Sequence, residues 1–432
     1  MNPLPAVRSA SSATSVPDAP PDAARDVVVV GGGLVGLAVA WRAAADGLAV
    51  TVLDPAPGDG ATHAAAGMLA PVTEADFGED DALRLHLAAA RSWPRFAADV
   101  EAATGSAVGL RTAGTLTVAY DTDDLALVRR VLALHAAHGL ASHELTTADA
   151  RRREPHLGPR VAGAAWAPHD HAVDPRATHA ALLAALSAAG AGLVRRAVTG
   201  VVRDATGRAV GVRDDAGHVH RAGAVVLAAG WRTGSLLADV PEVRVPTRPV
   251  KGQTLRLDAG PDLALEHVVR GVVQGRPVYV VPRSPAADGP RAGHREVVVG
   301  ATTEENPDDR RATAGGVFAL LRDARALLPG IDEAALVDVT PRARPATPDN
   351  LPLLGATPVP GLHVAAGHGR NGILLAPFTA EVVVAGITGA ALPPDAAAVV
   401  GPARPDRFAP DRAAPARAAA AHPTTTTRRT TP

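Results

Sequence analysis

A six-residue segment near the N-terminus, residues 31–36 with the sequence GGGLVG, constrains the fold more than any other part of the chain. It fits the pattern G-x-G-x-x-G. The apolar run before it, residues 26–30, predicts a fully buried parallel strand, and the Ala-rich run after it, residues 34–46, predicts a helix that stops at Gly47. A second buried strand is expected at residues 49–54. This order predicts the βαβ opening of a dinucleotide-binding domain.

The three glycines of the pattern have separate tasks. Gly31 allows a tight turn, Gly33 lets the backbone approach a pyrophosphate, and Gly36 lets the helix pack closely on the strand. The helix N-terminus offers free N–H groups and a partial positive charge to phosphates. Asp54, at the end of the second strand, is expected to accept hydrogen bonds from an adenosine ribose. A glycine-rich turn that only packs a helix on a sheet is the alternative, and the surrounding strand, helix and acidic residue argue against it.

A second signal is needed because the glycine pattern does not separate NAD from FAD. Residues 225–230, with the sequence VVLAAG, predict a buried strand that ends in small residues far downstream of the first. This segment resembles the one that returns beneath the dinucleotide in glutathione-reductase-type flavoproteins. A buried strand followed by a glycine turn, with no ligand, is the alternative.

Composition and charge exclude several classes of function. Lys plus Arg is 43 against 44 for Asp plus Glu, a formal net charge of −1, which argues against a nucleic-acid partner. The chain has no Cys, which excludes disulfides, cysteine metal sites, iron–sulfur clusters and thiol catalysis. The group His169-Asp170-His171 offers no fourth ligand at a suitable spacing, so we expect a surface or interface loop there and no metal.

No segment predicts a membrane span or a secretory signal. The uncharged run at residues 27–41 is too short to cross a bilayer, and residues 373–392 contain Pro377 and Glu381 and predict a buried helix. Residues 1–24 lack the apolar stretch of a secretory signal. We therefore expect a cytoplasmic protein without membrane association.

Three further segments carry a resemblance to a known family. They are residues 64–70 (AAAGMLA), residues 279–283 (YVVPR) with 299–302 (VGAT), and Arg344-Pro345 followed by residues 365–377 (AAGHGRNGILLAP). Together they closely resemble the glycine oxidases of thiamine biosynthesis, which are D-amino-acid-oxidase-like FAD-dependent amine oxidases. The resemblance runs from about residue 26 to residue 389, and its last segment is the most specific.

The resemblance implies an α/β fold with two interleaved domains. The FAD-binding domain, Rossmann-like and of the glutathione-reductase type, would contain residues 25–78, 150–246 and 341–395. An α+β substrate-binding domain on an antiparallel sheet would contain residues 79–149 and 247–340. Both ends of the chain are expected to be disordered tails, residues 1–24 and 400–432, because they are rich in Pro, Ala, Ser or Thr. The local patterns predict helices at 81–103, 125–138, 178–189 and 316–328, a hairpin at 200–214, and short strands at 224–227, 254–257, 277–281 and 296–300.

The resemblance also implies which residues bind FAD, and that it is bound non-covalently. Its pyrophosphate would lie at Leu34 and Val35, its ribose at Asp54 and Pro55, and its adenine at the backbone of Val198. One segment would line the flavin with its backbone: Ala61, Thr62, Ala66, Gly67 and Met68. Another would pass the isoalloxazine ring into the N-terminus of the last helix, whose dipole favours the anionic reduced flavin: His368, Gly369, Arg370, Asn371, Gly372, Ile373 and Leu374.

The substrate implied by the resemblance is a small amino acid with a free carboxylate. Arg344 matches the family's carboxylate-binding arginine, and a planar guanidinium suits bidentate binding; a surface charge is the alternative. Arg370 would touch both flavin and substrate, with its backbone carbonyl facing the amine. Tyr279 would donate its hydroxyl to the carboxylate, or else be a core aromatic residue.

The implied reaction is the oxidative deamination of glycine, with sarcosine and small D-amino acids as further candidates. A hydride would pass from Cα to flavin N5, so no catalytic side-chain acid or base is expected. Dioxygen would reoxidise the flavin and give hydrogen peroxide, and the imine would enter synthesis of the thiamine thiazole ring. Two alternatives stay open: a D-amino-acid dehydrogenase with a quinone acceptor, and a flavin-binding protein without turnover. A homo-oligomer is also expected from the resemblance.

Several residues depart from the pattern of the family. His63 lies just before the flavin-lining segment, where some relatives attach flavin to a histidine, but its position differs by one residue from theirs. Covalent flavin is therefore the minor alternative. Pro277, Val278 and Thr303 also differ from the residues expected near the substrate, which affects the breadth of substrates and not the class of reaction.

Overall fold

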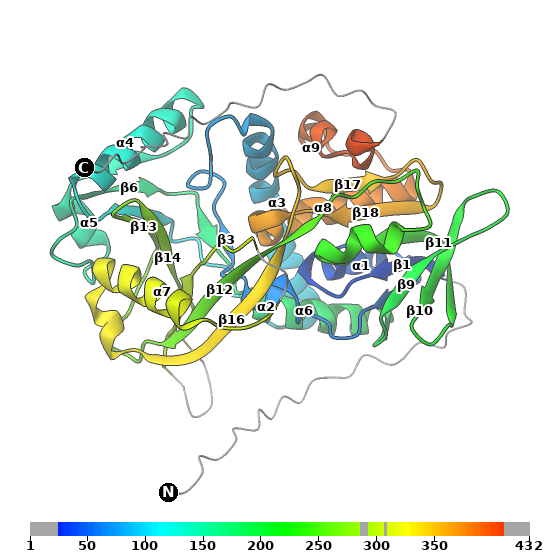
Figure 1. Ribbon diagram of the computed structural model, residues 1–432, viewed down its shortest axis with the longest axis horizontal. Coiled ribbons are helices and arrows are strands. Elements are labelled where there is room, and N and C mark those ends of the chain that lie inside the picture. The colour runs from blue at the N-terminus through cyan, green and yellow to red at the C-terminus, as the bar shows by residue number, and fades with distance from the viewer. Residues whose placement is uncertain (1–24, 286–292, 306–308, 410–432) are drawn as a thin grey trace, which may run out of the picture.

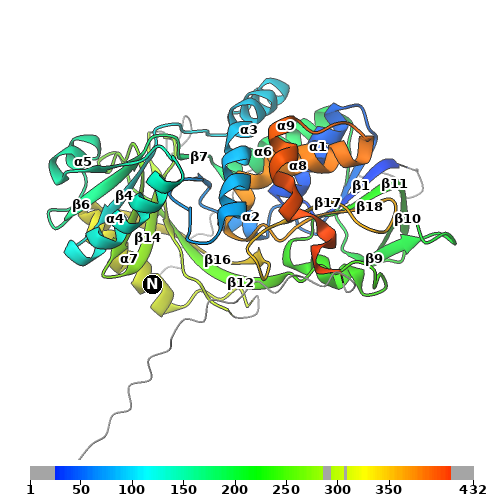
Figure 2. The same cartoon turned by 90° about the horizontal axis from the view of Figure 1, so that it is seen from above.

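The computed structural model describes residues 25–285, 293–305 and 309–409. Two eight-stranded sheets lie side by side and divide the molecule into two halves (Figure 1, Figure 2). The tail expected at residues 1–24 lies outside the described residues, as does the part of the other tail that begins at residue 410.

The first sheet contains the βαβ opening predicted from the sequence, with α1 (Leu34–Ala45) between two parallel strands. Its strands are β1 (Arg25–Val30), β2 (Val50–Leu53), β8 (Gly192–Val194), β9 (Val198–Arg203), β10 (Ala209–Asp214), β11 (Val219–Leu227), β17 (Leu353–Ala356) and β18 (Leu362–Ala366). The order is β17-β18-β11-β1-β2-β8, parallel from β18 to β8. The predicted hairpin is β9–β10, which extends the sheet by antiparallel pairing with β11.

Burial on both faces explains why β1 is one continuous apolar run. Val27 and Val29 pack on one face, in a core shared with α1 and the other helices of this half. Val28 and Val30 pack on the opposite face, against residues of β11 and the 3-10 helix η1 (Gly230–Leu237). A strand of this kind has no solvent side and therefore no polar alternation.

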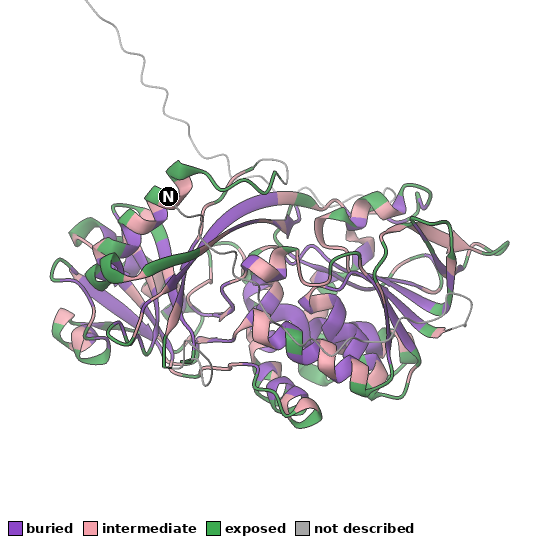
Figure 3. Cartoon of the chain, turned by 90° about the horizontal axis from the view of Figure 1, so that it is seen from below, coloured by how far each residue is buried: buried purple, intermediate pink, exposed green. Residues whose placement is uncertain are grey.

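Four helices cover the first of these faces: α1, α3 (Asp80–Thr104), α6 (Pro175–Ala188) and α8 (Gly372–Thr388). Helix α8 confirms the buried helix predicted near the end of the chain. Among the described residues, Gly369–Thr388 is the helical stretch long and apolar enough to cross a membrane. Most of it is buried between α1 and α3, and Figure 3 shows much of the helical layer of this half in purple, with pink and green on its outer turns.

The second sheet contains β4 (Thr115–Ala119), β5 (His143–Leu145), β6 (Gly163–Ala167), β12 (Arg248–Asp258), β13 (Val268–Val273), β14 (Arg276–Pro282), β15 (Glu296–Gly300) and β16 (Ala335–Ala346). Its order is β16-β12-β15-β14-β13-β4-β6-β5. The antiparallel prediction is confirmed for every pair except β4 with β13, which is parallel. Helix α7 (Ala314–Leu327) packs on one face, and α4 (Thr122–Ala137) and α5 (Thr147–Arg153) lie by β6 and β5.

Two long strands connect the halves of the molecule. β12 and β16 pair along their whole length, from Arg248 opposite Ala346 to Asp258 opposite Ala335. In Figure 1 they run from the second sheet toward the helices of the first. The smaller elements near this junction are α2 (Ala61–Ala64), β3 (Met68–Leu69), β7 (His171–Ala172) and the 3-10 helices η2 (Pro329–Glu333) and η3 (Gly369–Asn371).

The predicted division into domains is wrong at three places. Helix α3 lies in the stretch 79–149 that was expected in the substrate domain, yet its Trp93 and Phe96 pack in the core of the first sheet. β6 falls in the predicted FAD-binding stretch 150–246 but pairs with β4 and β5 of the second sheet. The expected boundary at residue 341 cuts β16. Local sequence patterns predict where helices and strands form. Which hydrophobic core a helix or strand packs into depends on residues far away in the sequence.

The expected disorder from residue 400 is also wrong for its first part. Helix α9 (Pro394–Val400) is followed by two 3-10 helices, η4 (Gly401–Ala403) and η5 (Pro405–Phe408). Arg407 anchors this segment by donating from Nε to Asp349 Oδ2 at 2.8 Å and from Nη2 to the carbonyl of Leu351 at 2.7 Å. Ala403 is fully buried. Specific hydrogen bonds such as those of Arg407 cannot be predicted from a composition rich in Pro and Ala.

Candidate functional site

A cavity of about 960 Å³ extends from the glycine-rich turn after β1 to the face of the second sheet. Most residues predicted from the sequence to bind cofactor or substrate line this cavity: Gly31, Gly33, Leu34, Val35, Asp54, Pro55, Ala61, Thr62, Ala66, Gly67, Met68, Val198, Tyr279, Arg344, His368, Gly369, Arg370, Asn371, Gly372 and Ile373. Gly36 and Leu374 are not part of its wall. One cavity therefore joins residues that are far apart in the sequence.

The glycine-rich turn is built by close backbone contacts. A Cβ on Gly36 would lie 2.0 Å from the carbonyl oxygen of Gly31, so Gly36 serves packing, as its position in the pattern predicts. Gly31 has φ +112°, and a Cβ there would lie 2.4 Å from the carbonyl oxygen of Ala228. Ala228 directly follows β11, so the second predicted segment, residues 225–230, does contact the turn. A Cβ on Gly33 would meet only Thr62 Oγ1, at 3.4 Å, and the rest of this surface is open to the cavity.

Asp54 fixes the turn from the end of β2. Its Oδ2 accepts a hydrogen bond from the backbone N–H of Gly32 at 2.6 Å, and its Oδ1 accepts from Ala56 at 2.8 Å. The carboxylate lies beside Pro55 in the cavity wall. Each carboxylate oxygen has a second lone pair, so the group keeps acceptor capacity for hydroxyls.

The segment from Ala64 to Met68 is held from the second sheet. Thr254 Oγ1 donates to the carbonyl of Ala64 at 3.0 Å, and Arg283 Nη2 donates to the carbonyl of Ala66 at 2.8 Å. Arg283 is buried; burial lowers its pKa to about 10, with Asp174 opposing, so the guanidinium stays charged near neutral pH. Gly67 has φ +81°, and a Cβ on it would lie 2.0 Å from the carbonyl oxygen of Val173.

The segment from His368 into α8 forms another wall. His368 is buried and its Nε2 lies 2.9 Å from Thr379 Oγ1. Burial lowers the pKa of His368 to about 3, so the imidazole is neutral. Leu374 points into the helical core, and its carbonyl accepts a hydrogen bond from Trp93 Nε1 at 2.9 Å. The predicted flavin segment therefore faces the cavity as far as Ile373.

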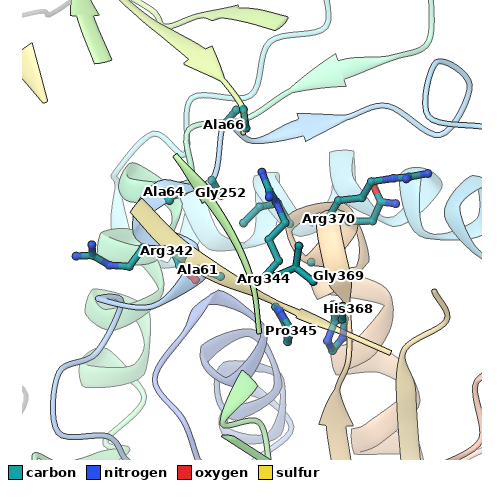
Figure 4. Close-up of a pocket in the computed structure, with 18 of the residues that line it drawn as sticks. Ala61, Ala64, Ala66, Gly252, Arg342, Arg344, Pro345, His368, Gly369 and Arg370 are labelled. Atoms are coloured by element: carbon teal, nitrogen blue, oxygen red, sulfur yellow. The ribbon is translucent and has the colours of Figure 1, made fainter. Parts of the chain in front are cut away.

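The guanidinium of Arg344 lines the cavity. Its Nη1 donates to the carbonyl of Thr302 at 3.2 Å, and within ranges 25–285, 293–305 and 309–409 no carboxylate forms an ion pair with it. Figure 4 shows its side chain beside Gly252 and Gly369, with Arg342 pointing away. Arg342 is bound to Asp59, from Nη2 to Oδ1 at 2.6 Å.

Tyr279 lies on β14 with its ring against Gly300, where a Cβ would come within 2.2 Å of the hydroxyl oxygen. Burial raises the pKa of Tyr279 above its usual value, although the positive charge of Arg344 opposes the shift. The hydroxyl is therefore protonated at neutral pH and able to donate a hydrogen bond. Tyr279 lines the cavity and also packs against a small buried cluster that contains Ala66 and Val281, so the structure is compatible with both expectations for it.

The guanidinium of Arg370 is bound by acidic residues. Its Nε lies 3.1 Å from Glu74 Oε2, and its Nη2 lies 3.6 Å from Glu79 Oε2. Arg270 Nη1 donates to the other oxygen of Glu74 at 2.5 Å. Burial raises the pKa of Glu74, but Arg270 and Arg370 outweigh it and hold the pKa below its usual value. The side chain of Arg370 is thus neutralised, which agrees with a role for its backbone alone.

Sequence reasoning missed Glu74, Arg270 and the role of Arg283. A signal was present for the two arginines. Arg270 interrupts the apolar run of β13, and Arg283 follows the apolar run of β14, where a charge needs a specific partner. The partners, Glu74 and Ala66, lie about two hundred residues away in the sequence.

Two histidine expectations have different outcomes. His63 lies on α2 but does not line the cavity, and its pKa is lowered by burial, with Arg176 and Arg342 adding to the shift. A surface or interface loop was expected at His169-Asp170-His171, and the surface position is wrong for Asp170, which is fully buried. Asp170 accepts from the N–H groups of Val72 and Thr73 at 3.0 and 2.6 Å. In the part of the chain that the structure describes, no cluster of three His, Asp or Glu side chains is arranged to hold a metal.

The comparison with protein families decides the identity of the cofactor. Residues 26–385 match the family described as FAD dependent oxidoreductase. The chain belongs to this family. FAD is accordingly the cofactor of this oxidoreductase, and the fold is the FAD-binding fold of its relatives.

Individual relatives are similar to this FAD-dependent oxidoreductase over most of its length. The glycine oxidase of Geobacillus kaustophilus is 34% identical over 363 residues, which covers 83% of this chain and 91% of the relative. Its crystal structure superposes with a TM-score of 0.78 at 32% identity, covering 89% of this chain and 99% of that chain. The bifunctional protein ThiO/ThiG of Nostoc sp. is also 34% identical, over 361 residues and 83% of this chain, and the chain spans about half of that relative, 52%.

The residues present fit FAD. The open face of Gly33 and the N-terminus of α1 suit a pyrophosphate. The N-cap residue Gly33 has no side chain, and the first N–H of the helix, that of Leu34, donates to Thr62 Oγ1 at 3.0 Å. Asp54 stands at the end of β2 with acceptor capacity for ribose hydroxyls. Backbone from Ala64 to Met68 and from His368 to Ile373 leaves a cleft between the two sheets for a flat ring.

Proposed function

We propose that this FAD-dependent oxidoreductase is a glycine oxidase that converts glycine to its imine. The observation that carries the proposal is Arg344, a guanidinium that lines the FAD cavity with no ion pair to the described residues. Three other charged groups near it, Arg270, Arg370 and Glu74, pair among themselves. One unpaired cation suits a substrate with one carboxylate. The names of the relatives, glycine oxidase and ThiO, support the same activity.

The side chains of this chain bind and orient the substrate. Arg344 binds the carboxylate through two parallel N–H bonds, and Tyr279 donates its hydroxyl to the same group. The backbone carbonyl of Arg370 accepts a hydrogen bond from the amine. The substrate is thereby held with its Cα toward the flavin, which supplies a two-electron acceptor when FAD is bound.

No side chain of this site acts as a general base in the proposal. His368 is neutral and bonded to Thr379, and Glu74 is shared by two arginines. Asp54 lies at the end of β2 and is bound to the glycine turn. The amine therefore binds in its neutral form, and the substrate loses its ammonium proton to water before it enters.

The finer parts of the proposal concern the other reactants and the state of the protein. Dioxygen is the electron acceptor, so that glycine, dioxygen and water give glyoxylate, ammonia and hydrogen peroxide, unless the imine is first used for the thiazole ring of thiamine. FAD is bound non-covalently, in keeping with His63 outside the cavity wall. The enzyme acts in the cytoplasm as a homo-oligomer, with sarcosine and small D-amino acids as secondary substrates.

Replacement of Arg344 tests this proposal. Arg344→Gln is expected to raise the KM for glycine at least about a hundredfold, because one partner of a desolvated charge pair is removed. Flavin content and its visible spectrum stay unchanged. The matched control is Arg213→Gln, an exposed arginine on β10 whose guanidinium donates to the carbonyl of Gly217. An Arg344→Gln enzyme with the KM and kcat of the control would contradict the assignment.

A further inference from the structure

We infer that Lys251, Glu304 and Thr302 form a positioning unit that aims the guanidinium of Arg344 at the substrate carboxylate. The inference rests on the proposed function of Arg344 as the carboxylate-binding residue. None of the three residues lines the cavity, so each acts through Arg344 and not on the substrate.

The carbonyl of Thr302 is the anchor of Arg344. It accepts from Nη1 at 3.2 Å, and the guanidinium also interacts with the hydroxyl of Tyr279 in the cavity wall. An arginine side chain has several rotatable bonds, and a single fixed acceptor removes much of that freedom before substrate arrives. The N–H groups of Arg344 that do not contact Thr302 or Tyr279 remain for the carboxylate.

Thr302 is itself held in place by hydrogen bonds from its side chain and from its backbone. Its hydroxyl donates to Glu304 Oε1 at 2.8 Å and accepts from the N–H of Gln253 at 2.9 Å. Its own N–H donates to the carbonyl of Gln253 at 3.2 Å. The hydroxyl and the backbone N–H of Thr302 are therefore both hydrogen-bonded. These bonds fix the orientation of the residue, and with it the direction of its carbonyl.

Glu304 receives charge and hydrogen bonds from β12. Lys251 Nζ lies 3.1 Å from Glu304 Oε2, and Gln253 Nε2 donates to Oε1 at 2.7 Å. The backbones of Lys251 and Glu304 exchange two hydrogen bonds of 2.9 Å. The segment after β15 thus lies along β12 as a short ladder that ends beside Arg344.

Lys251 provides the positive charge of this unit. It is the only lysine of the chain and its side chain is 1% exposed. It also binds Asp309, from Nζ to Oδ1 at 2.7 Å. A buried ammonium between two carboxylates keeps both ends of the segment from Glu304 to Asp309 against β12.

The first test uses two substitutions of Thr302. Thr302→Val keeps the branched shape and removes the hydroxyl that holds the carbonyl in place, and Thr302→Ser restores a hydroxyl. We expect the Kd of acetate, read from the change in the visible spectrum of the FAD-loaded protein, to rise about tenfold in Thr302→Val and less than threefold in Thr302→Ser. The KM for glycine should rise in the same ratio while kcat changes less than about twofold.

The second test asks whether Thr302 and Glu304 act as one unit. Glu304→Ala is expected to raise the Kd of acetate about tenfold, and Glu304→Gln, which keeps an acceptor for Thr302, only slightly. The double variant Thr302→Val/Glu304→Ala should bind acetate no more weakly than either single variant does. The inference would be overturned if the increase in the Kd of acetate in the double variant equalled the product of the two single increases. An unchanged Kd in Thr302→Val would also overturn it.

The acetate readout separates this inference from the proposed function. Acetate has a carboxylate and no amine, so its Kd reports the aim of Arg344 without turnover. If the wild-type protein fails to oxidise glycine but the Kd values follow the expected pattern, the proposed function fails and the positioning unit stands. If glycine is oxidised and the Kd values are the same in all variants, the positioning unit is wrong.

Discussion

Gly252 and Arg344 form a complementary pair on the neighbouring strands β12 and β16: a Cβ on Gly252 would lie 2.3 Å from Nη1 of Arg344. Only a residue without a side chain leaves room for the guanidinium at this point. The backbone of Gly252 has no left-handed conformation that would require glycine. The glycine is explained by the close approach of the arginine alone.

Gly252→Ala should therefore displace Arg344 without unfolding the sheet. We expect the KM for glycine to rise about tenfold or more, because the guanidinium loses its alignment with the carboxylate. The control is Gly200→Ala on β9, where a Cβ would meet no atom within 4 Å. Steady-state kinetics of the two variants with glycine checks the prediction, and an equal KM in both would show that Gly252 does not shape the site.

A second prediction concerns Gly33. In the protein alone a Cβ there meets only Thr62 Oγ1, at 3.4 Å, so Gly33→Ala should leave the stability of the FAD-free protein almost unchanged. The methyl group occupies the surface assigned to the pyrophosphate, and we expect the Kd of FAD to rise at least about tenfold. Fluorescence titration of the FAD-free protein measures this. Equal FAD affinity in the wild type and the variant would place the pyrophosphate elsewhere.

Arg283 gives a third prediction, on stability. Its guanidinium donates to the carbonyls of Ala66 and Val173, both inside the protein. Arg283→Met would leave two buried acceptors without a donor and should lower the free energy of unfolding by about 3 kcal/mol, together with the FAD content. Urea unfolding of the FAD-free proteins tests it. A matched variant, Arg213→Met on the exposed hairpin, should change stability by less than about 0.5 kcal/mol.

The buried histidines predict the dependence of stability on pH. Burial lowers the pKa of His86 to about 4, of His363 to about 4 and of His368 to about 3, against 6.5 in the unfolded chain. A lowered folded-state pKa gives stability that is present above pH 6.5 and is lost as the pH falls from there toward 4. Asp170 acts in the opposite direction, because burial raises its pKa from 3.8 to about 6.

Near pH 5 the unfolded state therefore binds about three more protons at these three histidines and about one fewer at Asp170. These four groups together should lower the free energy of unfolding by roughly 3 kcal/mol per pH unit as the pH falls, the effect of two protons. Urea unfolding at pH 5 and pH 6, with FAD in fixed excess, gives this slope. His363→Leu, a change outside the cavity wall, should reduce the slope by about 1.4 kcal/mol per pH unit. The same slope in the variant would refute the assignment to His363.

The sequence predicts the parts of the fold that have local causes. The turn at residues 31–36 with its flanking β1 and α1, the hairpin β9–β10 and the helix α8 agree with the structure because each depends on neighbouring residues. The order of strands in the second sheet and the place of β6 depend on pairing across long separations, and the local pattern does not contain them.

The same distinction holds for the site. Arg344 and Tyr279 can be proposed from short motifs, and the structure brings both to the cavity. Glu74, Arg270 and Arg283 cannot, because each acts through a partner from a distant part of the chain. The space for Arg344 is likewise set by Gly252, which lies in a different strand and in no motif.

The most direct test of the account is the visible spectrum of the purified protein under anaerobic conditions, before and after glycine is added. The account predicts a flavin band that bleaches with glycine and returns when dioxygen is admitted. Sarcosine and D-alanine are added in parallel to rank the secondary substrates. A flavin band that glycine leaves oxidised, while a D-amino acid bleaches it, would contradict the proposed substrate, and a band that no amino acid bleaches would contradict the proposed function itself.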